Sequence, residues 1–173
     1  IQMLDARERR VHHQPELLAR YGKPLVCFTM NIAGPVKDTP LIRRGFARGR
    51  QLLERQFLRC RWTPLSTNVS RAVTGCEAFY VLDASPLEIK RLTTLVEDAS
   101  PLGRLFDMDV LCPDGRKVDR EELQLEGRRC LLCGGPAKVC SSRRVHTVAA
   151  LQEKTTEILT RTFTELDAAT AAQ

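Results

Sequence analysis

The sequence lacks any long apolar run and has few aromatic residues. The chain has 173 residues, and no apolar run in it approaches the roughly 20 residues that a membrane-spanning helix needs. This excludes an integral helical membrane protein. Aromatic side chains make up 5%, so there are few platforms on which nucleic-acid bases could stack. Apolar residues at 43% and charged residues at 28% argue against wholesale disorder. One globular domain, with at most a small appendage, is expected.

The first residues also lack the apolar segment of a signal peptide, since Asp5, Arg7 and Glu8 lie where that segment would be. We therefore expect a cytoplasmic protein whose scattered cysteines are reduced. No Ser-His-Asp or Cys-His arrangement stands out, so the sequence does not favour catalysis by an activated serine or cysteine.

Acidic residues are too few to balance the basic ones, and the excess is local. Lys+Arg total 27 against 21 Asp+Glu, a net charge of +6, and most of the basic residues are arginine. Residues 37–61 hold eight basic and two acidic side chains, which accounts for the whole excess. Arginine binds planar and polyanionic groups through a fixed fork of donors, so this segment predicts an anionic partner.

The hydrophobic pattern predicts an α+β core. Thr39-Pro40 and the capping box Ser85-Pro86-Leu87-Glu88 mark two helix starts. The predicted strands cover 25–30, 62–73, 78–82 and 104–111, and the predicted helices cover 40–59 and 86–98. This βαββαβ order is typical of a two-layer, ferredoxin-like sandwich.

Further elements are expected on both sides of this core. Residues 1–127 are predicted to form the catalytic domain, and residues 128–173 a Cys/His knuckle with a C-terminal helix, packed with it as one unit. The flanking predictions are a helix over 5–21, a hairpin partner over 116–119, a helix over 147–166 and a frayed end over 168–173.

Asp107-Met108-Asp109 is the first candidate for chemistry. Residues two apart in a strand point to one face, and two adjacent carboxylates favour a cation such as Mg²⁺. Gly103 and Arg104 just upstream add a phosphate-binding group. The alternative is an edge strand with a solvated face, on which paired acids need no ligand.

Gly34-Pro35-Val36-Lys37 is a second candidate, at a strand-to-helix turn. Lys37 and the free N–H groups of the following helix suit a phosphate, with Arg43 and Arg44 one turn further on. The alternative is an ordinary tight turn before a capped helix.

Cys130-x₂-Cys133-x₆-Cys140-x₅-His146 is the third candidate. Three thiolates and one imidazole within seventeen residues match a closed, structural zinc site. A redox pair or unligated cysteines are the alternatives.

The fourth candidate is an arginine face on the helix predicted over 40–59. Arg44, Arg48, Arg55 and Arg59 lie opposite the apolar stripe of that helix and point outward. A solvated helix surface is the usual reading, but the scarcity of acids among these arginines favours a docking surface for an acidic partner.

Several blocks resemble the CitX family, the apo-citrate lyase phosphoribosyl-dephospho-CoA transferases. The resemblance is collinear over roughly residues 6–152, and Ser100 departs from the histidine expected before Pro101. The matching blocks are 6–11, 31–37, Arg44-Gly45-Phe46, 101–110, 128–133, and Cys140 with Arg144-x-His146.

The resemblance implies a nucleotidyltransferase-type enzyme. It would transfer phosphoribosyl-dephospho-CoA from 2′-(5″-triphosphoribosyl)-3′-dephospho-CoA to a serine of the acyl carrier subunit of citrate lyase, releasing pyrophosphate. Asp107 and Asp109 would hold Mg²⁺, and Arg104 and Lys37, with Arg43 or Arg44, would bind the phosphates. Arg48, Arg55 and Arg59 would dock the carrier.

Three points stay open at this stage. A non-enzymatic module that binds nucleic acid through zinc knuckle and basic helix is the main alternative, and a binding-only chaperone for the carrier is a weaker one. Asp38 and Asp83 are candidates for a third magnesium ligand.

Overall fold

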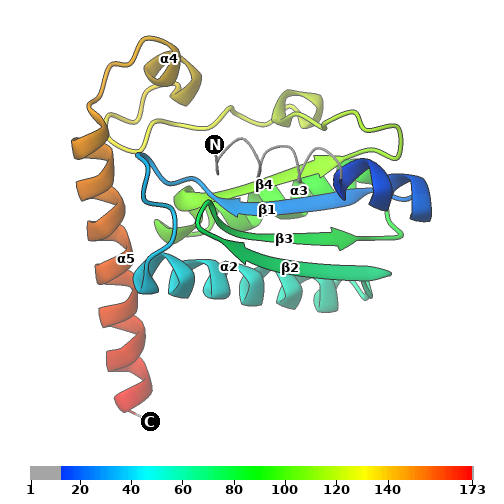
Figure 1. The fold of residues 1–173 in the computed structure, drawn as a ribbon, viewed down its shortest axis with the longest axis horizontal. Helices are drawn as coiled ribbons and strands as arrows, with labels where there is room; N and C mark the ends of the chain where they lie inside the picture. Colours follow the sequence, from blue (N-terminus) through cyan, green and yellow to red (C-terminus); the bar gives the residue numbers. More distant parts are fainter. Residues whose placement is uncertain (1–12, 173) are drawn as a thin grey trace.

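A computed structural model describes residues 13–172, which form a four-stranded antiparallel sheet with helices packed against it (Figure 1). The strand order is β2-β3-β1-β4, so the first and third strands lie in the centre. The strands are β1 (Leu25–Met30), β2 (Ser66–Ala72), β3 (Gly75–Val81) and β4 (Phe106–Leu111). The predicted α+β class is confirmed, and so is each of the four predicted strands within a few residues.

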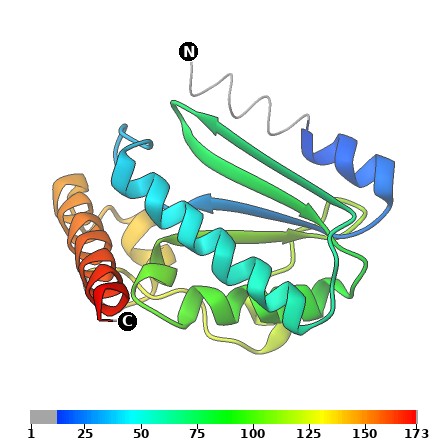
Figure 2. The same cartoon turned by 90° about the horizontal axis from the view of Figure 1, so that it is seen from below.

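Two helices cover one face of this sheet (Figure 2). They are α2 (Pro40–Arg59) and α3 (Pro86–Asp98), which match the predicted helices. The Thr39 hydroxyl caps α2 by accepting a hydrogen bond from the N–H of Ile42 at 3.2 Å. On α2, Gly49 allows a close approach to the sheet, because a Cβ there would lie 2.5 Å from the ring of Phe28. The core between the two layers is therefore tightly packed.

A smaller apolar cluster lies on the opposite face of the sheet. Residues 13–21 are helical, and Leu17 and Leu18 pack there against Leu25 and Phe79. The predicted N-terminal helix is thus confirmed over its described part, whereas residues 5–12 lie outside the described residues. Asp109 pairs in register with Cys27 and shares this face of the sheet.

One local prediction was wrong, and another was confirmed only in part. The Ser85 side chain makes no capping hydrogen bond, so the predicted box is absent at α3, which begins with Pro86 at its first position. The predicted hairpin partner over 116–119 is reduced to a bridge between Leu111 and Lys117. Its extension is prevented because Asp119 begins the short helix η2 (Arg120–Leu123) with a capping box of its own.

The C-terminal segment contains α4 (Ala137–Ser142) and the long helix α5 (Val148–Ala171), which runs past the N-terminal end of α2 (Figure 1). The prediction of a frayed end from residue 168 was wrong, since α5 continues to Ala171. Arg44 explains part of this length, because its guanidinium stacks on Phe163 and donates to Asp167 Oδ2 at 3.1 Å. No helix among residues 13–172 is long and apolar enough to cross a membrane.

Candidate active site

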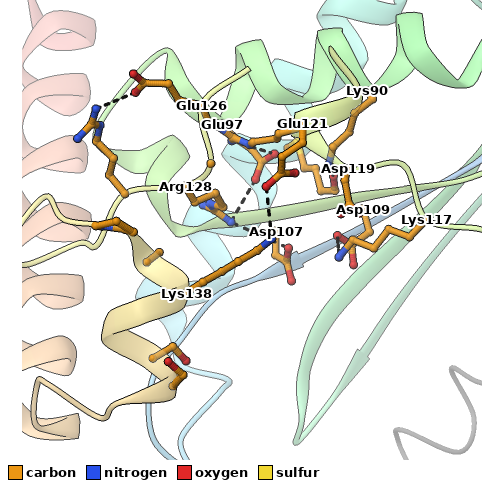
Figure 3. Close-up of a pocket in the computed structure, with 18 residues that line it drawn as sticks. Lys90, Glu97, Asp107, Asp109, Lys117, Asp119, Glu121, Glu126, Arg128 and Lys138 are labelled. Atoms are coloured by element: carbon orange, nitrogen blue, oxygen red, sulfur yellow. Dashed lines mark hydrogen bonds and ion pairs between the residues drawn. The ribbon is translucent and has the colours of Figure 1, made fainter. Parts of the chain in front are cut away.

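A cleft of about 790 Å³ lies between β4, α3, η2 and α4 (Figure 3). We call it the carboxylate cleft. Its ionisable lining comprises six acidic and six basic side chains, so its formal charges balance. They are Glu97, Asp107, Asp109, Asp119, Glu121 and Glu126, with Lys90, Lys117, Arg120, Arg128, Arg129 and Lys138.

Asp107 and Asp109 both line this cleft, as the two-residue period of a strand predicts. The pKa of Asp107 is raised, first by burial and then by the negative charge of Asp109. Lys117 offsets part of that charge, with its Nζ 2.6 Å from Asp109 Oδ1. The same two carboxylates suit a divalent metal ion such as Mg²⁺, because this hard cation prefers oxygen ligands.

Glu97, at the end of α3, forms the inner wall of the cleft. Only 3% of its side chain is exposed, and its oxygens lie 3.1 Å from Arg128 and 3.5 Å from Arg120. Burial raises the pKa of Glu97 to about 7 in spite of the two guanidinium groups. Arg128 also lies 4.0 Å from Asp107, so Glu97 holds this arginine beside the carboxylate pair.

Sequence reasoning missed Glu97 and its neighbour Lys90, whose Nζ donates to the carbonyl oxygen of Met108 at 3.4 Å. A signal was present, because Lys90, Thr94 and Glu97 follow one another at helical spacing and all three are buried. Burying a polar stripe on the inner side of a helix costs free energy unless the polar groups find partners, as they do at a polar site. Arg128 was also missed as a site residue, although it belongs to the block that precedes Cys130.

Arg104 and Gly103 lie next to the carboxylate cleft but not in its lining. Arg104 donates to the backbone carbonyls of Arg129 and Cys130, at 2.8 and 3.0 Å. Gly103 packs on the end of α3, where a Cβ would lie 2.5 Å from the carbonyl oxygen of Glu97. The structure therefore places Gly103 in backbone packing and leaves Arg104 beside the cleft.

The predicted phosphate site around Gly34 is not brought together with Asp107. Lys37 donates to the Ile32 carbonyl, and burial lowers its pKa. Arg43 pairs with Asp38 at 3.1 Å, and Gly34 lies against the side chain of Gln152. These groups are engaged locally, and Arg44 is held by α5, so they lie apart from the carboxylate cleft.

The two candidates for a third magnesium ligand also lie elsewhere. Asp38 is shared between Arg43 and Arg71, and Asp83 pairs with Lys23 at 2.7 Å. The docking candidates Arg48, Arg55 and Arg59 lie on the face of α2 away from its buried residues, and none of them lines the carboxylate cleft.

The four predicted zinc ligands do come together. The ligand atoms of Cys130, Cys133, Cys140 and His146 all lie within 4.8 Å of one another, and the sulfurs of Cys133 and Cys140 are 3.5 Å apart. His146 Nε2 is buried without a hydrogen-bond partner among the described residues, which is unfavourable unless a ligand occupies it. This Cys₃His cluster could bind a metal such as zinc.

The comparisons with known proteins agree with one another. The family model described as apo-citrate lyase phosphoribosyl-dephospho-CoA transferase matches residues 1–162. A Vibrio cholerae protein named probable apo-citrate lyase phosphoribosyl-dephospho-CoA transferase is 37% identical over 91% of this chain and 89% of its own length. A Citrobacter koseri protein named apo-citrate lyase phosphoribosyl-dephospho-CoA transferase is 35% identical over 87% of this chain and 82% of its own length.

A similarly named Escherichia coli protein is 33% identical over 91% of this chain and 86% of its own length. These relatives are named as transferases, so the comparisons do not favour the nucleic-acid-binding alternative. The matches cover nearly the whole chain and include both the Asp107–Asp109 strand and the cysteine cluster. The chain belongs to the apo-citrate lyase phosphoribosyl-dephospho-CoA transferase family.

Proposed function

We propose that this enzyme attaches the phosphoribosyl-dephospho-CoA group to a serine hydroxyl on the acyl carrier subunit of citrate lyase. The donor is 2′-(5″-triphosphoribosyl)-3′-dephospho-CoA. The serine oxygen bonds to the α-phosphorus, the bond from that phosphorus to the bridging oxygen breaks, and pyrophosphate leaves as the hydroxyl proton is released. The family membership supports the reaction, and the carboxylate pair in a cleft with arginines supports its location.

Asp107 and Asp109 carry this proposal. They are the two residues that would hold Mg²⁺, because they share one face of β4 and open into the carboxylate cleft. A bound Mg²⁺ would offset phosphate charge and lower the pKa of the attacking hydroxyl. Lys117 neutralises Asp109 in the absence of such an ion and would release it when the ion binds.

Arg128 and Arg104 would offset the charge that builds on the leaving pyrophosphate. Glu97 keeps Arg128 oriented at 3.1 Å, so this guanidinium needs no reorganisation when the donor enters. In this proposal Glu97 is a positioning residue, whereas Asp107 and Asp109 are the residues that would hold the metal ion.

Three finer assignments are part of the proposal. The βαββαβ core is of the ferredoxin-like class, which the strand order β2-β3-β1-β4 supports. The Cys₃His cluster holds a structural zinc ion, because four protein ligands leave no open position for substrate. The outward arginines Arg48, Arg55 and Arg59 dock the carrier subunit, since carrier proteins are typically acidic.

Mass spectrometry tests the reaction directly. Purified carrier subunit, the donor, Mg²⁺ and this protein are mixed, and the mass of the carrier is measured. We expect a gain equal to one phosphoribosyl-dephospho-CoA group. An unchanged carrier mass, with correctly folded protein and intact donor, would refute the proposed function.

A substitution locates the reaction in the cleft. Asp107→Asn keeps the shape of the side chain but removes its charge, so transfer should fall by a factor of about 100 or more while the fold is retained. Asp83→Asn is the matched control, because Asp83 is an exposed acid that pairs with Lys23 away from the cleft. Near-normal transfer by Asp107→Asn would contradict the metal role.

A further inference from the structure

A second cavity of about 470 Å³ adjoins the carboxylate cleft, between the Cys₃His cluster, the start of α5 and the segment after β1. Its lining contains four arginines and no acidic residue, so we call it the arginine pocket. The four are Arg104, Arg128, Arg129 and Arg144. Its volume lies within the range of small-ligand sites, roughly 300–1,000 Å³.

The two cavities differ sharply in charge although they share part of their walls. Arg128, Arg129 and Ser141 line both of them. The carboxylate cleft has six acidic side chains beside its six basic ones, so its formal charges balance and it has no net attraction for a chain of phosphates without a metal ion. The Asp, Glu, Lys and Arg side chains that line the arginine pocket are all arginines, so a polyanion that reaches Asp107 would extend into this pocket.

Three of the four arginines of this pocket have hydrogen-bond or ion-pair partners, and two of the four have no carboxylate partner among the described residues. Arg104 is held by two backbone carbonyls, and neither Arg104 nor Arg144 has a carboxylate partner among the described residues. Arg129 pairs with the exposed Glu126 at 2.8 Å, and Arg128 is held by Glu97. Arg104 is therefore an oriented guanidinium group without a counter-ion, which suits an anionic ligand from outside the chain, and Arg144 adds a second unpaired charge.

Arg144 adds an independent observation. Its φ is +49°, in the left-handed region where a residue other than glycine is strained, and it directly follows Arg143, the C-cap of α4. Glycine would form this turn without strain, yet an arginine occupies it at the wall of the pocket. This turn places the charge of Arg144 at the wall of the pocket.

The cysteine cluster builds this pocket. Cys130, Cys140 and His146 all contribute to its lining, and Arg129 directly precedes Cys130. Since Arg104 donates to the carbonyl of Cys130, the loop that carries the cluster also orients Arg104. The position of the pocket at one end of the carboxylate cleft therefore depends on the fold of the Cys/His segment.

We infer that the arginine pocket binds the terminal triphosphate of the donor, with Arg104, Arg128, Arg129 and Arg144 as its ligands. This inference rests on the proposed function, and it names the subsite from which pyrophosphate leaves. Arg128 is common to both cavities, so the α-phosphorus lies between the pocket and Asp107. The donor also has an internal diphosphate of similar chemistry, in its dephospho-CoA part, which we place outside this pocket.

Calorimetric binding of inorganic tripolyphosphate to the full-length protein tests the subsite without the transfer reaction. Arg144→Gly removes the charge and also relieves the strained turn, so the protein should be at least as stable as the wild type in thermal unfolding. We expect its affinity for tripolyphosphate to fall about tenfold or more, because charge-assisted hydrogen bonds are lost. Arg143→Gln is the control, since Arg143 is exposed and does not line the pocket.

Dephospho-CoA serves as the second ligand, because it carries the internal diphosphate but not the triphosphate. Its affinity should be the same for the wild type, Arg144→Gly and Arg143→Gln. Equal tripolyphosphate affinity in all three proteins, or a loss confined to dephospho-CoA, would overturn the inference. Either result leaves the transfer assay unaffected as a separate test, so failure of the subsite and failure of the proposed function are distinguishable.

Discussion

The guanidinium of Arg128 lies 3.1 Å from the carboxylate of Glu97, a side chain that is only 3% exposed. This contact joins the end of α3 to the segment before Cys130 and holds a positive charge beside Asp107. The carboxylate has a pKa of about 7 because it is buried, so its protonation changes within the physiological range. The protonation of Glu97 therefore affects both the stability of the fold and the charge beside Asp107 in the candidate site.

The pKa of Glu97 predicts a pH dependence of stability. Its pKa is raised from 4.5 to about 7 in the folded protein, so between these values the folded state binds a proton that the unfolded chain releases. The contribution of Glu97 to the free energy of unfolding is therefore largest below pH 4.5 and falls as pH rises through 7. In Glu97→Gln this decline should be absent.

Urea unfolding of wild type and Glu97→Gln at a series of pH values from 4.5 to 8 measures the difference. Asp98→Asn is the control, because Asp98 also pairs with Arg120 but its side chain is 57% exposed. If Glu97→Gln retains the wild-type slope, the buried carboxyl does not titrate as stated. Transfer by Glu97→Gln should also be slower, since Arg128 loses a charged partner.

Gly103 is predicted to be essential for packing. In Gly103→Ala the new Cβ would lie 2.5 Å from the carbonyl oxygen of Glu97 and 2.6 Å from that of Val96. These backbone atoms can move aside only by distorting the end of α3, so we expect the free energy of unfolding to fall by about 1–3 kcal/mol. Gly127→Ala is the control, because its nearest neighbour would be 4.0 Å away. Equal denaturation midpoints for the two variants would contradict this.

The Cys₃His cluster is predicted to bind a zinc ion in the purified protein. Protein purified without chelator should contain about one zinc ion per chain by elemental analysis, and Cys133→Ser should contain much less. Removing the ion should lower the melting temperature and weaken tripolyphosphate binding, because the loop that orients Arg104 loses its anchor. Cys60→Ser, which alters an exposed cysteine outside the cluster, should retain the metal. Absence of metal from wild-type protein would refute the site.

Charge reversal on α2 tests the docking surface. Arg55→Glu combined with Arg59→Glu should raise KM for the acidic carrier severalfold and weaken the rise of KM with added salt, while donor binding is unchanged. Both side chains are exposed and lie outside the two cavities. Arg20→Glu with Arg161→Glu changes the net charge equally at other exposed positions and should have a smaller effect. Equal KM values for the two double variants would exclude α2 as the carrier surface.

Local periodicity was sufficient to predict the core elements of this protein. The strand at 104–111 and the helix at 40–59 follow from patterns of period 2 and 3.6, and the same alternation places Asp107 and Asp109 on one face. The four metal-ligand candidates were also predictable, because their spacing along a short segment limits how far apart they can lie.

Only the tertiary structure decided which basic side chains lie beside Asp107 and Asp109. Lys37 and Arg43 are near in sequence to a phosphate-like turn, but they find partners in Ile32 and Asp38. Arg128 reaches Asp107 because the segment after β4 folds back along α3. Pairing of charges depends on distances across the fold and on burial, and neither quantity is encoded in the spacing of residues along the chain.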